Sequence, residues 1–100
     1  MRKNFRTYQL AADFYRLCRE LTLPRHAKDQ LSRASFSIAL NLAEGSGRKT
    51  SADTKRFYTM AMGSLRESQA VLELECTGNL EAVELADKLG AHLFRLIRNT

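Results

Sequence analysis

The chain has 100 residues, 44% of them hydrophobic, and its 16 Lys/Arg against 11 Asp/Glu give a net charge of +5. This length suits one domain, 1–100, and excludes a second. No apolar run of about 18 residues indicates a membrane span, and the first ten residues lack the apolar segment of a signal peptide, so we expect a cytoplasmic protein without a membrane partner.

The first predicted helix is marked by apolar residues that recur at intervals of 4, 3 and 4 and would share one helical face: Leu10, Phe14, Leu17 and Leu21. Pro24 follows this stripe. Because the residue before a proline is pushed away from helical geometry, we expect the helix to end near Thr22.

The second predicted helix runs from about His26 to Glu44. Its apolar stripe consists of Ala27, Leu31, Ala34, Ile38 and Leu42. We expect helix-cap and close-packing roles for the glycines of the following joint, Gly45 and Gly47. Gly45 is placed to be the C-terminal cap, where a positive φ favours glycine.

The third predicted helix is long, from about Ser51 to Thr77, or roughly 40 Å, and Thr50 or Ser51 is its expected N-cap. Gly78-Asn79 ends it. The fourth helix, about Glu81 to Arg98, has apolar residues at heptad-like intervals, which is typical of near-parallel helix packing. Four helices with short connections predict an all-α, up-down-up-down four-helix bundle.

The joint NLAEGSGRKT, residues 41–50, resembles a phosphate-binding loop only superficially. A P-loop requires G-x-x-x-x-G-K-[ST] after a strand, whereas here Ala43 replaces the first glycine, Arg48 precedes Lys49, and a helix precedes the loop. The free N–H groups at the start of the third helix still predict an anion-binding corner flanked by four cations. These are Arg48, Lys49, Lys55 and Arg56.

Polar residues at helical spacing predict a network that fixes helix register or a subunit seam. Its members are Arg33, Ser37, Asn41, Glu44, Ser64 and Glu67. A partly buried Glu44 would need a cation, with Arg33, Arg48 and Arg56 as candidates. A catalytic pair of Glu44 and Glu67 is the enzymatic alternative, but no further general base accompanies it.

Gly63 lies in the middle of the third predicted helix, where glycine costs about 1 kcal/mol relative to alanine. We expect close helix packing to offset this cost, with Gly90 and Ala91 of the fourth helix as the neighbours. The two cysteines, Cys18 and Cys76, and the two histidines have no metal-ligand spacing. We therefore expect reduced thiols, no metal and no cofactor.

Residues 33–67, RASFSIALNLAEGSGRKTSADTKRFYTMAMGSLRE, carry a family resemblance. They resemble a bacterial four-helix-bundle family that includes the 23S rRNA intervening-sequence proteins and is similar to the accessory variability determinant proteins of diversity-generating retroelements. The motif S-I-x-x-N-I-A-E-G-x-G-R matches from Ser37 to Arg48, and R-F with A-x-G-S-L-x-E matches from Arg56 to Glu67. Ala39 and Ser68 depart from common family residues.

The resemblance implies a homopentameric ring and no enzyme. For the retroelement relatives it implies a basic barrel that binds nucleic acid and a reverse transcriptase. The intervening-sequence branch, which this sequence matches more closely, brings no established biochemical role.

Two function classes follow. The first is a non-catalytic, oligomeric scaffold that binds RNA or DNA through phosphates, without sequence specificity; its candidate residues are Arg2, Lys3, Arg6, Arg48, Lys49, Lys55 and Arg56, with Arg16, Arg19, Arg25 and Lys28 as a secondary set. Residues 67–100 hold 3 Lys/Arg and 6 Asp/Glu, so we do not expect them to face a polyanion. The second class is a protein-interaction module, a structural ring or an accessory subunit, whose cations serve solubility.

Overall fold

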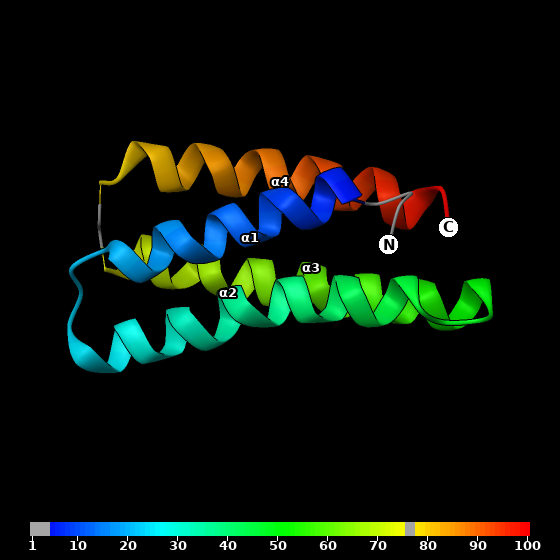
Figure 1. The fold of residues 1–100 in the computed structure, drawn as a ribbon. Helices are drawn as coiled ribbons and strands as arrows, with labels where there is room; N and C mark the ends of the chain where they lie inside the picture. Colours follow the sequence, from blue (N-terminus) through cyan, green and yellow to red (C-terminus); the bar gives the residue numbers. More distant parts are fainter. Residues whose placement is uncertain (1–4, 76–77) are drawn as a thin grey trace.

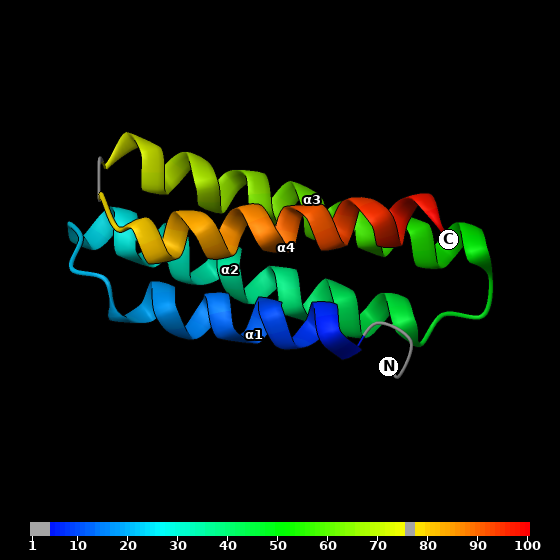
Figure 2. The ribbon, with the colours of Figure 1, turned by 90° about the horizontal axis from the view of Figure 1, so that it is seen from above.

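The computed structural model describes residues 5–75 and 78–100, and the regular structure in these ranges is helical. The helices are α1 (Phe5–Glu20), α2 (Arg25–Ser46), α3 (Ser51–Leu74) and α4 (Leu80–Arg98). Successive helices run antiparallel, and α4 packs back against α1 (Figures 1 and 2). The all-α, up-down-up-down bundle predicted from the sequence is confirmed.

The core lies along the bundle axis and is built from the predicted stripes. In α1, Leu10 and Phe14 are buried, and α2 contributes Leu31, Ile38 and Leu42 with no exposed surface. Burying one such side chain stabilises the fold by about 1.5–3 kcal/mol. The helical periodicity therefore identified the inward faces correctly.

The joint between α2 and α3 differs from the prediction. Gly45 is not the cap of α2, because the helix continues through Ser46 and is capped by Gly47, whose φ is −93°. Gly45 is buried inside the helix, and a Cβ built on it would lie 2.7 Å from Cε1 of Tyr58 and 3.1 Å from Cβ of Phe57. Glycine is required here by the close approach of α3 and not by a positive φ.

The start of α3 and the turn before α4 agree with the cap chemistry of the sequence. Thr50 is the N-cap of α3, and its Oγ1 accepts a hydrogen bond from the Asp53 N–H at 3.1 Å. The helix ends at Leu74, before the expected boundary; Thr77, the predicted last residue, lies outside the described residues. Gly78 has a φ of 63°, and Asn79 caps α4.

Gly63 does not have the predicted packing role within the chain. It is exposed on α3, and no heavy atom lies within 4 Å of a Cβ built on it. Gly90 instead faces Leu65, whose Cδ2 lies 3.4 Å from the Cβ position. The expected close approach of Gly63 to α4 is therefore wrong.

Within the described residues, none of the helices combines the length and the apolar character needed to cross a bilayer.

Candidate anion-binding site at one end of the bundle

The antiparallel arrangement brings the N-termini of α1 and α3 to the same end of the bundle as the C-termini of α2 and α4 (Figure 1). We call this the cationic end. Among the described residues it holds seven cations, Arg6, Arg48, Lys49, Lys55, Arg56, Arg95 and Arg98, and two acids, Glu44 and Asp53. At the opposite end, the residues around the α3–α4 turn carry acids, namely Glu73, Glu75, Glu81, Glu84 and Asp87, while the cations of that end lie on α1 and α2.

Arg2 and Lys3, the first two cations of the predicted set, lie outside the described residues. The secondary set does not join the cationic end. Arg16, Arg19, Arg25 and Lys28 lie where α1 ends and α2 begins, at the opposite end of the bundle.

A cavity of about 650 Å³ opens at the cationic end, lined by residues from all four helices and from the α2–α3 joint. Its titratable side chains include Arg6, Lys49, His92 and Arg95, and Asp or Glu side chains are absent from its described lining. The net acidity of residues 67–100 does not hold locally, because α4 contributes Arg95 and His92 to this lining while its acids lie toward the other end.

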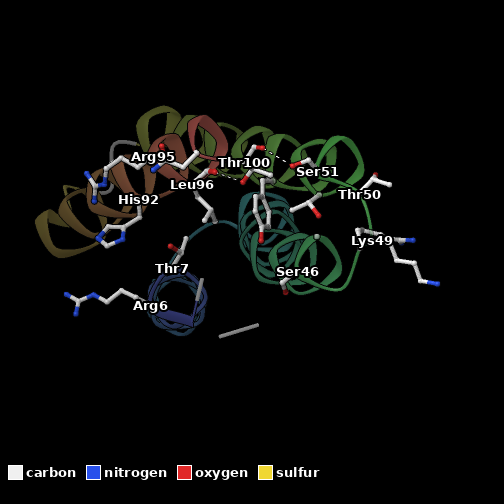
Figure 3. Close-up of a pocket in the computed structure, with 15 residues that line it drawn as sticks. Arg6, Thr7, Ser46, Lys49, Thr50, Ser51, His92, Arg95, Leu96 and Thr100 are labelled. Atoms are coloured by element: carbon white, nitrogen blue, oxygen red, sulfur yellow. Dashed lines mark hydrogen bonds between the residues drawn. The ribbon is translucent and has the colours of Figure 1, made fainter. Parts of the chain in front are cut away.

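The lining has two cationic edges (Figure 3). Arg6 of α1 lies beside His92 and Arg95 of α4, while Lys49 lies on the opposite side, at the α2–α3 joint. Burial lowers the pKa of His92, and the nearby charges of Arg95, Arg6 and Lys88 lower it further. The part of this lowering that the three cations cause reflects a local positive potential.

Hydroxyl groups lie between these edges. Thr7, Ser46 and Ser51 all line the cavity, and Ser51 Oγ donates a hydrogen bond to the main-chain oxygen of Thr100 at 3.0 Å. Thr7 is 5% exposed, and the described residues provide no hydrogen-bond partner for its hydroxyl. A buried hydroxyl without a protein partner is uncommon and calls for a ligand or water.

Two of the predicted cations are held in an internal cluster. Arg48 pairs with Glu44 at 2.8 Å, and Arg56 pairs with Asp53 at 2.8 Å. Both guanidinium groups also lie 4.5 Å from the ring centroid of Phe57. Arg48 and Arg56 are thus positioned and partly neutralised by the chain itself.

The other five cations of this end have no acidic partner among the described residues. Arg98 lies 5.9 Å from the ring centroid of Phe94, and the remaining four are Arg6, Lys49, Lys55 and Arg95. Exposed cations without acidic partners retain their full attraction for an external anion. These four are the strongest candidates for phosphate contact.

The predicted polar network separates into three parts. Asn41 Nδ2 donates to Ser37 Oγ at 3.0 Å, and Ser64 Oγ donates to Ser37 Oγ at 2.9 Å, which links α2 to α3. Arg33 and Glu67 are joined only through Gln30, which bonds to both.

Glu44 lies apart from these groups and pairs with Arg48, one of the three cations proposed for it. The two carboxylates of the enzymatic alternative, Glu44 and Glu67, belong to different parts of the network, and neither lines the cavity at the cationic end.

Cys18 is buried in the core, and this burial raises the pKa of its thiol to about 12. Clusters of three or more His, Cys, Asp and Glu suited to a metal are absent from the described residues. Cys76 lies outside them.

Sequence reasoning missed three residues of the site: Thr7, His92 and Arg95. Each lies on a helix whose neighbours in sequence gave no chemical motif. Their positions could have indicated the site. Each lies near a helix end that an up-down bundle places beside the α2–α3 joint.

A family model described as 23S rRNA-intervening sequence protein matches residues 3–99, almost the whole chain. Comparison with curated proteins gave no match, and neither did comparison with solved structures.

Proposed function

Because the chain belongs to the 23S rRNA-intervening sequence protein family, and because one end of its bundle is cationic, we propose that it is a non-catalytic, homo-oligomeric scaffold that binds RNA or DNA through phosphates. The observation that carries this proposal is the convergence of Arg6, Lys49 and Arg95 on one cavity without an Asp or Glu side chain in its lining. RNA is the first ligand to test, since the family description names an rRNA.

The separation of charge along the bundle supports this function. Scattered cations that pair with acids keep a protein soluble without creating a binding surface, whereas cations gathered at one end produce a potential that attracts a polyanion. At the cationic end the unpaired cations come from α1, α3, α4 and the α2–α3 joint, so only the folded chain presents them together.

The proposed binding is not sequence-specific. The internal cluster around Phe57 holds Arg48 and Arg56 against their own acids, which leaves them little freedom to read base edges. The remaining cations are exposed and come from separate segments and not from one recognition helix, so we expect them to contact phosphates.

Exposed apolar side chains support the oligomeric part of the proposal. On α4, Leu80 is 67% exposed and Phe94 is 60% exposed, and on α2 Phe36 and Leu40 are also exposed. Self-association would bury such side chains, and each added subunit would contribute another cationic end. The experiment is sedimentation of the parent and of Phe94→Ser. A parent that stays monomeric up to roughly 100 μM contradicts this part.

Binding is tested by fluorescence anisotropy of labelled single-stranded RNA and DNA over a series of salt concentrations. The cationic-end variant replaces four of the unpaired cations with glutamine: Arg6, Lys49, Lys55 and Arg95. The matched control makes the same change in charge away from this end, at Arg16, Arg19, Arg25 and Arg66, all of which are exposed.

We expect the parent to lose affinity steeply as salt rises, because phosphate binding releases counterions. Removal of four contacts lowers the salt slope by about 3 for a single strand, at roughly 0.7 per contact. The control variant keeps most of the affinity. Equal losses in both variants contradict a site at the cationic end, and absence of binding at low salt contradicts nucleic-acid binding altogether.

The alternative is a protein-interaction module, either a structural ring or an accessory subunit of an enzyme such as a reverse transcriptase. The exposed apolar side chains favour it as well. A parent that oligomerises but binds neither RNA nor DNA at low salt would support this alternative.

A further inference from the structure

We infer that the cavity at the cationic end is a binding site for a terminal phosphate group, a phosphomonoester carried by a nucleotide or by the end of a nucleic-acid strand. The inference rests on the proposed function in taking phosphate as the anion. It goes further in assigning one cavity, one chemical form of phosphate and a set of contacts.

We place the phosphate on the side of the cavity that is lined by Arg6 of α1 and by His92 and Arg95 of α4, and we call this side the phosphate seat (Figure 3). Arg6 enters from α1, and His92 and Arg95 enter from α4. Arg6 and Arg95 have no ion pair among the described residues, and both act electrostatically on His92. Two guanidinium groups without acidic partners that both act on one histidine would be stabilised by an anion between them.

Thr7 gives an independent indication of a ligand. Its side chain lies on the face of α1 that is turned toward α4, beneath His92 and Leu96 (Figure 3). Thr7 is 95% buried, and none of the described residues accepts or donates a hydrogen bond to its hydroxyl. A phosphate oxygen within the cavity would accept that hydrogen, which removes the cost of an unpaired buried donor.

The depth of this hydroxyl favours a terminal phosphate over an internal one. A phosphodiester within a strand carries a chain on both sides, so it cannot be inserted end-on against a buried group. A phosphomonoester has three free oxygens and a charge of about −1.5 to −2 at pH 7. It therefore reaches the interior and matches the two unpaired arginines in charge.

The size of the cavity fits this ligand class. A volume of about 650 Å³ lies within the range of about 300–1,000 Å³ typical of small-molecule sites. Beyond the phosphate seat, the lining continues past Ser46 and Ser51 to Lys49 at the opposite edge, where the rest of a nucleotide would lie.

The first experiment titrates the full chain with adenosine 5′-monophosphate and follows the histidine resonances by NMR. His92 lines the cavity, whereas His26 lies at the other end beside Glu75, so its resonances serve as an internal control. We expect the ligand to shift the His92 resonances and to raise the pKa of His92, because a phosphate dianion offsets the charges of Arg6, Lys88 and Arg95. Unchanged His92 resonances overturn the inference.

The second experiment uses two variants of the seat and one control. Arg95→Gln removes a charged contact and should weaken binding of the nucleotide about tenfold or more. Thr7→Val removes the hydroxyl while keeping the side-chain shape; it should weaken binding and leave the melting temperature unchanged or higher, since no described partner is lost. Arg19→Gln, remote from the cavity, should bind as the parent does.

The third experiment distinguishes this inference from the proposed function. A 5′-phosphorylated oligonucleotide should bind more tightly than the same strand with a 5′-hydroxyl, and Arg95→Gln should abolish the difference. Equal binding of the two strands overturns the terminal-phosphate site but leaves the polyanion surface intact. If neither strand binds while the nucleotide still shifts His92, the proposed function fails and the terminal-phosphate site stands.

Discussion

Two glycines on neighbouring helices give predictions of opposite sign for one substitution, Gly→Ala. In a helix interior, alanine is favoured over glycine by about 1 kcal/mol because glycine loses more backbone entropy on folding. If the measured change in the free energy of unfolding is less favourable than this gain, the new methyl group lacks space. Gly45 and Gly63 differ sharply in that space.

At Gly45, the new Cβ would lie 2.7 Å and 2.8 Å from two ring carbons of Tyr58 and 3.1 Å from Cβ of Phe57. The Tyr58 ring is 2% exposed, and a Cβ atom moves only with its backbone, so neither neighbour can yield freely. Overpacking of a core costs about 1–3 kcal/mol, which exceeds the gain in helix propensity. We therefore expect Gly45→Ala to lower the free energy of unfolding by up to about 2 kcal/mol.

At Gly63, nothing lies within 4 Å of the new Cβ, so the gain in helix propensity remains. We expect Gly63→Ala to raise the free energy of unfolding by about 0.5–1 kcal/mol, and the melting temperature by roughly 4–8 °C per kcal/mol.

Denaturant and thermal unfolding followed by circular dichroism measure both variants, at two protein concentrations so that a change in self-association is recognised. A stabilised Gly45→Ala refutes the packing argument at Tyr58. If Gly63→Ala lowers the free energy of unfolding by the same amount at both protein concentrations, the conclusion that the space around Gly63 is open is refuted.

Three further outcomes test separate parts of the structure. Thr50→Ala should lower the unfolding free energy by about 1 kcal/mol through loss of the cap to the Asp53 N–H, with Thr50→Ser retaining most of it; equal losses would contradict the cap. Ser64→Ala should cost about 0.5–1.5 kcal/mol in the same assay, because the bond to Ser37 joins α2 and α3; an unchanged midpoint would make that bond irrelevant. Since burial raises the pKa of Cys18 to about 12 from 9.0, its neutral thiol stabilises the fold fully below pH 9, and this contribution is lost as pH rises above 9. Between about pH 9 and 10.5, this one group should lower the free energy of unfolding of the parent by about 2 kcal/mol. Cys18→Ala lacks the thiol, so its free energy of unfolding should fall less over the same range. Parallel curves for the two proteins would refute the shift.

The sequence determined the architecture because helical periodicity is a local property. The stripe from Leu31 through Ile38 to Leu42 places each side chain on one face whatever the helix packs against, and these residues are fully buried. Cap chemistry is local too, so the sequence narrowed the N-cap of α3 to Thr50 or Ser51, and the structure has Thr50. Short connections between four such helices then permit little besides an antiparallel bundle.

The tertiary structure decided what the local pattern leaves open. The sequence motif around Gly45 is equally compatible with a cap and with a packing contact, and only the ring of Tyr58, on another helix, distinguishes them. For the cations, spacing along the chain indicated Arg48 and Arg56 at the joint, but these two pair with Glu44 and Asp53. Arg6 and Arg95 instead join Lys49 and Lys55 as cations without an acidic partner among the described residues. Arg6 and Arg95 are 89 positions apart and meet at one cavity because alternate helices run in opposite directions. Charge and burial at a site depend on which helix ends meet, and that is a property of the folded bundle and not of any one segment.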